Sequence, residues 1–348
     1  MRIMKWSARL GLFGAAVAGS AIAATALAAE VDGPKVNWDF SLWGNPRSTT
    51  LAAQFMVDNA VAKTGGNFAI KMHWGETLSP IKENIDGIKI GAFQLAFASA
   101  GFHPGKVPTW EMISLPFLPI QDLKIQARVM TGYYLQPAVA ADGARWSLKV
   151  ILPTLIPSYQ LMGVGQPPKT IGDLKGRRIR GLGQMSTALA KVGAVPTSMP
   201  SPELLGSLER GLLDAVSLDP TNFKAYRIHE VGKWYTTNLS LGLGPGVFIV
   251  GLDAYNKLPP QYRKVLEDGG QAGLPKQVLQ YETDIREAIE LYDKSKLTAV
   301  TFGQEDIAKF QEVARPIWDA FAADLETKGY PGRQLLEWLL AEAKKVSS

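Results

Sequence analysis

The sequence predicts an α/β protein made of two lobes. From about residue 35 onward, short segments with strand character alternate with segments of helical spacing, a pattern typical of α/β folds. The alternation forms two series, one before and one after Pro157, which indicates two units. The sequence has no internal repeat. It also has no Gly/Ser-rich linker between the two units, so a hinge between the lobes has to consist of strands or helix.

The elements of each series can be placed in order. The first series has strand-like segments separated by helical ones: strands at 35–43, 68–74 and 94–100, helices at 48–65 and 81–91. The second has the same character: strands at 159–164, 177–182, 195–200 and 214–219, helices at 185–192 and 202–211. We therefore expect lobe I to comprise 29–157 plus about 247–278, and lobe II 158–246 plus about 279–348.

A long helix should connect the two lobes. After the strand-like "GVFIVGL" at 246–252, the chain becomes mostly helical. Tyr281, Ile285 and Tyr292, together with Ala288 or Ile289, have the spacing of one apolar helix face. The length of this region suits a helix that bridges both lobes.

The N-terminus has the features of a cleavable secretory signal peptide over residues 1–28. Arg2, Lys5 and Arg9 precede an apolar run that ends in Ala26-Leu27-Ala28, a small-residue cleavage pattern. An uncleaved membrane anchor is the alternative, although the run is rich in Ala and Gly and only weakly apolar. No later segment is long and apolar enough to span a membrane. We predict export to the periplasm and no membrane-spanning segment in the mature chain.

Composition narrows the classes of partner. Removal of the signal peptide leaves 34 basic against 32 acidic residues, so the charge of the mature chain does not indicate a nucleic-acid partner. The chain has no cysteine, which excludes disulfides and thiolate metal sites. His73, His103 and His229 are scattered and have no partner at metal-ligand spacing. We predict no metal and no cofactor.

Motifs of common enzyme classes are incomplete. Ser99 in "FASAG" lacks the leading glycine of a nucleophile elbow. The pair His229-Glu230 lacks the second histidine of a zinc motif, and the glycines of "GLGQMS" and "GLGPG" fall short of a dinucleotide fingerprint. We therefore predict a protein without catalytic residues.

A cluster of arginines marks a candidate ligand site. In "KGRRIRGLG" at 175–183, a short strand turns toward a helix. Ile179 should face the core, while Arg178 and Arg180 share the other face and Arg180 lies nearest the C-terminal exit of the strand. Open α/β sheets bind ligands at that exit. Taken alone, the cluster fits a solvated basic turn better than a ligand site, since charged side chains are mostly exposed.

The cluster and its flanks resemble the signature of the TRAP-transporter solute-binding proteins, the DctP family. The resemblance rests on "LKGRRIRGLG" at 174–183 and "LAKVGAVPTSMPSPELLGSLERGLLDAV" at 189–216. Further family landmarks occur in order at 61–78, 85–118 and 258–273, so the similarity covers about Lys35 to Lys328. It implies a venus-flytrap fold that captures a small organic anion in the periplasm and delivers it to a membrane permease of two subunits.

The resemblance also implies roles for individual residues. Arg180 matches the family's arginine that clamps a substrate carboxylate, a task for which a planar guanidinium is well suited because it can form two parallel bonds and stays charged. Arg177 and Arg178 would lie on the surface. Tyr159 occupies the place where the family often has a second arginine. The chain departs from the family pattern at Asp219, whose carboxylate could accept a hydrogen bond from a substrate hydroxyl.

The class of ligand is predicted from aromatic residues at the exits of the first three strands. Trp43, Trp74 and Phe102 should border the cleft and form an apolar box with Tyr159. For each of them a core position is an equally good interpretation. Polar substituents of the ligand could be served by Asn45 and Ser99. This arrangement predicts an aromatic or branched hydrophobic monocarboxylate ahead of a C4-dicarboxylate, for which a second cation would be expected.

Two functions of other classes stay open at this point. The ligand-bound protein could be recognised by a sensor kinase instead of a permease. It could also be a periplasmic enzyme in which Arg180 orients an acid for a reaction by Asp219 or Tyr159. We expect a monomer.

Overall fold

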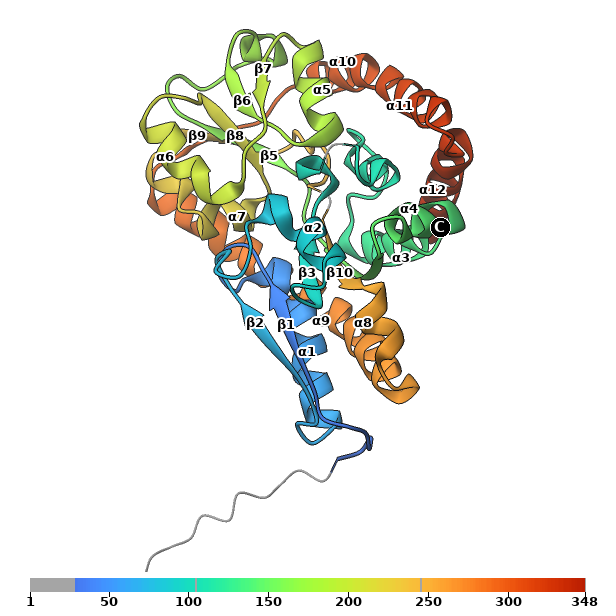
Figure 1. Cartoon of the computed structure of the whole chain (residues 1–348). Helices are drawn as coiled ribbons and strands as arrows, with labels where there is room; N and C mark the ends of the chain where they lie inside the picture. The colour runs from blue at the N-terminus through green and yellow to red at the C-terminus, as the bar shows by residue number, and fades with distance from the viewer. Residues whose placement is uncertain (1–28, 104, 245, 348) are drawn as a thin grey trace, which may run out of the picture.

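The computed structural model describes residues 29–347 except 104 and 245, and it contains two separate mixed sheets (Figure 1). The predicted signal peptide lies outside the described residues. The first sheet has the order β2-β1-β3-β10-β4. Its strands are β1 (Val36–Ser41), β2 (Phe68–His73), β3 (Leu95–Ala98), β4 (Leu148–Pro153) and β10 (Val247–Gly251). β1 is parallel to β2 and β3, and β10 is antiparallel to β3 and β4.

The second sheet has the order β11-β9-β5-β8-β6-β7. Its strands are β5 (Gln160–Gly163), β6 (Arg178–Arg180), β7 (Val195–Thr197), β8 (Ala215–Leu218), β9 (Trp234–Thr236) and β11 (Thr298–Val300). β6 is parallel to both neighbours, β7 and β8, whereas β5 is antiparallel to β8 and β9. Each sheet thus has parallel strands that end at one common edge, and the loops at such edges carry the binding groups of open α/β folds.

Helices cover the faces of both sheets. Those next to the first sheet are α1 (Leu51–Lys63), α2 (Asn84–Lys89), α3 (Leu123–Tyr134), α4 (Pro137–Ala144) and α8 (Leu252–Lys257). Those next to the second are α5 (Gly183–Lys191), α6 (Leu204–Glu209) and α7 (Pro220–Ala225). The strands they cover are buried, as Phe40, Leu95, Ile179 and Val216 have no exposed surface. Among the described helices, none combines the length and the apolar character needed to cross a membrane.

Two extended segments cross between the sheets side by side. The first follows β4 and the second precedes β10, and hydrogen bonds pair them: Thr154 N donates to Gly246 O at 3.0 Å and Tyr159 N to Gly242 O at 2.8 Å. The two halves are thus connected by paired extended segments, in keeping with the predicted hinge that contains no flexible linker. The pairing also fixes Tyr159 at the point where the chain enters the second sheet.

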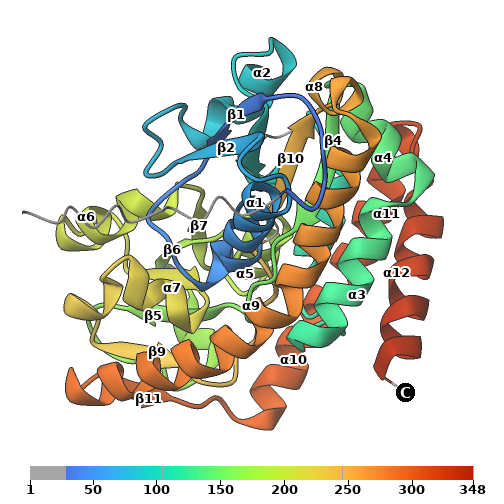
Figure 2. The same cartoon turned by 90° about the horizontal axis from the view of Figure 1, so that it is seen from below.

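The long helix α9 (Pro260–Lys294) is confirmed and runs along both sheets (Figure 2). Its first half packs on α1, where a Cβ at Gly273 would lie 2.8 Å from the backbone of Ala52. Near its end, Tyr292 packs against Phe223 of α7 and Tyr235 of β9. Glycine at the first contact lets the two helix backbones approach closely.

Three helices follow β11 and run along one side of the molecule (Figure 1). They are α10 (Gln304–Ala314), α11 (Pro316–Thr327) and α12 (Gly332–Ser347). α10 lies against α5, beside the second sheet, and α12 lies against α3, beside the first. The C-terminal helices therefore touch elements of both halves, and the predicted assignment of residues 279–348 to lobe II stays a prediction.

Candidate functional site

Arg180 is the last residue of β6, and its guanidinium is buried with only 1 % of the residue exposed. Nε donates to the carbonyl of Met199 at 3.1 Å, and Nη1 donates to the carbonyl of Ser217 at 2.9 Å. Burial lowers the pKa of Arg180 from its ordinary value, and the neighbouring hydroxyls of Tyr159 and Tyr226 act against that shift. Two neutral carbonyls thus fix the side chain, and the phenol of Tyr159 lies next to it, so these neighbours leave the positive charge of Arg180 unbalanced.

Tyr159 lies beside Arg180, as the sequence predicted, and it is 4 % exposed. Burial raises the pKa of Tyr159 to about 12, although the Arg180 guanidinium next to it acts in the opposite direction. The ring lies directly against Gly244 on the second crossing segment, where any side chain would overlap the phenol. Tyr159 is therefore a neutral phenol at neutral pH, held in place from both sides.

A second arginine, Arg47, enters the same region from the loop after β1. Its Nη1 donates to the carbonyls of Trp43 at 3.3 Å and Asn45 at 2.7 Å. Its Nε donates to Oδ1 of Asn222 in α7, a helix of the second half, at 3.1 Å. The guanidinium also lies over the ring of Trp43, 4.2 Å from its centroid. Sequence reasoning used the neighbours Trp43 and Asn45 but missed Arg47, whose only signal was a cation at a strand exit.

Tyr226, just after α7, connects the two arginines. The Arg47 guanidinium lies 5.3 Å from the centroid of its ring. Burial raises the pKa of Tyr226, whereas the positive charges of Arg47 and Arg180 both lower it. A Cβ at Gly44 would approach the Tyr226 hydroxyl to 2.8 Å, so the loop after β1 touches this tyrosine directly. One cation from each half of the molecule therefore converges on one phenol.

Asp219 has a structural role that the sequence prediction did not assign. It is the N-cap of α7: Oδ1 accepts from Thr221 N at 3.0 Å, Thr221 Oγ1 at 2.6 Å and Asn222 N at 3.1 Å. Oδ2 accepts from the side chain of Asn222. Burial raises the pKa of Asp219, and these hydrogen bonds oppose the shift. Three of these four donors bond to Oδ1 and one to Oδ2, and a contact of Asp219 with a ligand hydroxyl stays a prediction.

The residues predicted at the exits of β1 and β3 have different environments. Trp43 is buried and stacks on Phe97 of β3, with ring centroids 3.4 Å apart. Asn45 is exposed, and its carbonyl helps to orient Arg47. Ser99 is 3 % exposed, and its hydroxyl has no hydrogen-bond partner among the described residues. Their contact with a ligand stays a prediction.

The other two predicted aromatics are half-buried. Trp74 packs on the core cluster of the first sheet alone. Phe102 packs against both core clusters. The residue before it, Gly101, faces the second half directly, because its Cβ would lie 3.5 Å from the backbone nitrogen of Gly183 at the start of α5. The segment after β3 therefore bridges the halves near the end of β6, whereas Trp74 lies on one side of that region.

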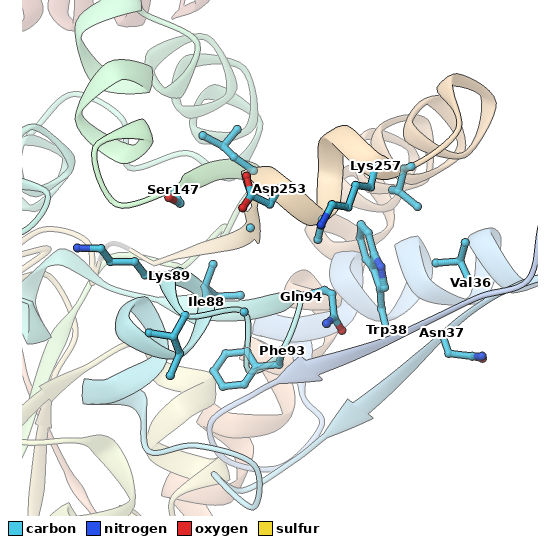
Figure 3. Close-up of a pocket in the computed structure, with 16 residues that line it drawn as sticks. Val36, Asn37, Trp38, Ile88, Lys89, Phe93, Gln94, Ser147, Asp253 and Lys257 are labelled. Carbon is cyan, nitrogen blue, oxygen red and sulfur yellow. The ribbon is translucent and has the colours of Figure 1, made fainter.

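A cavity of about 450 Å³ lies elsewhere, at the opposite edge of the first sheet (Figure 3). It is formed where β1 begins and β10 ends, and Figure 3 shows Trp38, Gln94, Asp253 and Lys257 around it. No residue predicted for the ligand site lines this cavity. Within the described part of the chain, no group of three or more acidic, histidine or cysteine side chains could hold a metal ion.

Known proteins share this architecture. A monocarboxylate 2-oxoacid-binding periplasmic protein of Nostoc is 22 % identical over 296 residues, which are 83 % of this chain and 80 % of that protein. A TRAP solute-binding protein from Rhodoferax ferrireducens in complex with copurified benzoate superposes with a TM-score of 0.79 at 22 % identity, covering 90 % of this chain and all of that one. One from Roseobacter denitrificans with bound β-D-glucuronate gives 0.77 at 19 % identity, with 88 % and 99 % covered.

The family comparison covers most of the chain. Residues 41–324 match the model of the DctP family, described as bacterial extracellular solute-binding protein, family 7. The match begins at the last residue of β1 and includes all the other strands of both sheets, together with Arg47, Tyr159, Arg180 and Tyr226. With the two-lobed fold of the solved relatives, it confirms the resemblance noted in the sequence, and the chain belongs to the DctP family of TRAP-transporter solute-binding proteins.

Proposed function

We propose that this protein captures a small organic acid, whose carboxylate is clamped by Arg180, and delivers it to the membrane subunits of a TRAP transporter. The observation that carries the proposal is the environment of Arg180. Its guanidinium is buried, its protein partners are two carbonyls and the phenol of Tyr159, all neutral, and no carboxylate among the described residues pairs with it. A buried charge is costly unless an opposite charge balances it, so an anionic ligand completes this site.

The ligand class we propose is an aromatic or branched hydrophobic monocarboxylate. Tyr159 and Tyr226 lie near Arg180, and Phe102 follows Gly101, which faces the start of α5; large rings of this kind suit an apolar group next to a carboxylate. The benzoate complex of the Rhodoferax relative supports this class, whereas the glucuronate complex shows that the same fold also holds a hydrophilic acid. A C4-dicarboxylate would require a second cation, and Arg47 is a second cation in this region.

We also propose that the chain is exported to the periplasm by its signal peptide, acts as a monomer and catalyses no reaction. The family supports the first and the last points, since its members are extracellular solute-binding proteins. Recovery of every bound acid unchanged after prolonged incubation with the pure protein is the expected result.

Two variants test the role of Arg180. Arg180→Met should weaken acid binding by about 2–5 kcal/mol, because it removes the cation that balances the buried carboxylate. Arg177→Met is a matched control, since Arg177 also donates to two backbone carbonyls, those of Asp173 and Gln166, both at 2.9 Å. The control should bind like the parent.

The measurement has two stages. A thermal-shift screen of aromatic, branched and C4 acids first identifies a ligand, because a ligand present at a hundred times its Kd stabilises the folded state by about 2.7 kcal/mol. Calorimetry with that acid then compares the parent with both variants. Parental affinity in Arg180→Met, or a loss confined to Arg177→Met, would place the anion site elsewhere.

A further inference from the structure

Three buried polar atoms near the meeting point of the two halves have no hydrogen-bond partner among the described residues: Arg47 Nη2, Ser99 Oγ and Tyr226 Oη. Arg47 and Tyr226 are in contact, as their 5.3 Å cation–ring distance shows. Ser99 follows β3, whose parallel neighbour β1 leads into the loop of Arg47, so both emerge at one edge of the first sheet. Buried polar groups are normally paired, and unpaired ones call for an explanation.

The geometry of Arg47 shows what its free atom can do. Both hydrogens of Nη1 are directed to carbonyls, and Nε is bonded to Asn222. Asn222 is itself held by Asp219, so a chain of hydrogen bonds that reaches into α7 fixes the guanidinium of Arg47. Only Nη2, with two hydrogens, is left over, and a buried charged donor of this kind needs an oxygen acceptor.

The position of Tyr226 limits where that acceptor can be. Tyr226 lies against Arg47, which donates to Asn222 in α7, the helix that directly follows β8. Arg180 donates to the carbonyl of Ser217 in β8, so the two guanidiniums approach the same end of β8 from opposite halves. A plain monocarboxylate held by Arg180 would leave Nη2 of Arg47 and the hydroxyls of Ser99 and Tyr226 without partners. The three groups are therefore available as donors to a second oxygen of the ligand.

We propose that Arg47 is a second ligand-binding residue and that the site prefers 2-oxo or 2-hydroxy acids over the same acids without that oxygen. This inference rests on the proposed capture of an acid by Arg180. It assigns the carboxylate to Arg180 and the 2-oxygen to Nη2 of Arg47, assisted by Ser99 and Tyr226. Because Arg47 and Arg180 come from different halves, such a ligand also ties the two halves together.

The test uses pairs of acids that differ only in the second oxygen: phenylglyoxylate against phenylacetate, and 4-methyl-2-oxopentanoate against 4-methylpentanoate. The parent should bind the oxygenated member of a pair roughly ten to a hundred times more tightly, as expected for a hydrogen bond to a charged donor. In Arg47→Met this preference should fall to less than threefold, while the acid without the oxygen keeps its affinity within a few-fold.

Two further variants separate the possible outcomes. Arg180→Met should weaken both members of a pair alike, because it removes the shared carboxylate clamp. Ser99→Ala should reduce the preference partly and is a conservative alternative if Arg47→Met does not fold. Equal affinities within the pairs in the parent, or a preference that survives in Arg47→Met, would overturn this inference and leave the Arg180 clamp intact. Failure of the parent to bind any of the acids would overturn both.

Discussion

The contact between α9 and α1 gives a sharp prediction about the bridging helix. In Gly273→Ala, the new Cβ would lie 2.8 Å from both Cα and O of Ala52 and 3.2 Å from its carbonyl carbon. Ordinary contacts of a Cβ begin near 3.4 Å, so the helices have to separate by at least about 0.6 Å at this point. Because the opposing atoms are backbone, no side chain can rotate away, and overpacking of this kind costs about 1–3 kcal/mol.

Gly270→Ala provides the control for helix propensity. It lies one turn earlier in α9, is also buried, and its Cβ would meet only side-chain atoms, Leu152 Cδ1 at 3.3 Å and Met56 Sδ at 3.5 Å. Both substitutions gain about 1 kcal/mol from the better helix propensity of alanine. The free energy of unfolding of Gly273→Ala should therefore be about 1–3 kcal/mol lower than that of Gly270→Ala.

Thermal and urea unfolding of both variants measure this difference. With an unfolding entropy of about 2.1 cal/mol/K per residue, 1 kcal/mol corresponds to roughly 1.5 °C in a chain of this size, so a gap of about 1.5–5 °C is expected. Equal melting temperatures would refute the argument, because they would mean that α1 and α9 can separate at no cost. Gly273→Ala should also weaken acid binding, since α9 fixes the first crossing segment through Tyr281 and Gln277.

Two further predictions concern buried polar groups. Tyr281→Phe removes the hydrogen bonds from its hydroxyl to Thr49 Oγ1 at 3.0 Å and Leu155 O at 2.9 Å, and urea unfolding should show a loss of about 1–3 kcal/mol; an unchanged unfolding midpoint would argue against a structural role for this contact. Burial, with the charge of Lys106 as a smaller cause, lowers the pKa of His103 to about 4. The unfolded chain then takes up a proton that the folded chain refuses, so stability is complete above pH 6.5 and falls by up to about 3 kcal/mol as the pH drops through 4. His103→Asn should flatten that part of the pH profile of stability, and an identical profile in variant and parent would contradict the assignment.

The strands and the long helix were predictable because their signals are local. The exposure of Arg178 and the burial of Ile179 follow from the alternation of a strand, and the apolar face of Tyr281 and Tyr292 follows from helical spacing. Arg180 is buried as well, which alternation alone does not predict. The register that aims Arg180 at the edge of the sheet needed no tertiary information. The sequence could not predict which loops from the other half meet Arg180, because that depends on how the two sheets face each other.

Arg47 is a residue whose role could not be predicted from the sequence, and Asp219 is one whose structural role could. Arg47 becomes a site residue only through Asn222, which is 175 positions away in the chain, so no local pattern distinguishes it from an exposed cation. The signal for Asp219 was local and readable: an aspartate followed by Pro220 is a typical helix N-cap with proline at the first helical position. Its carboxylate holds Asn222, and Asn222 holds Arg47. The acid predicted to touch the ligand therefore also orients, through Asn222, the arginine that the sequence did not reveal.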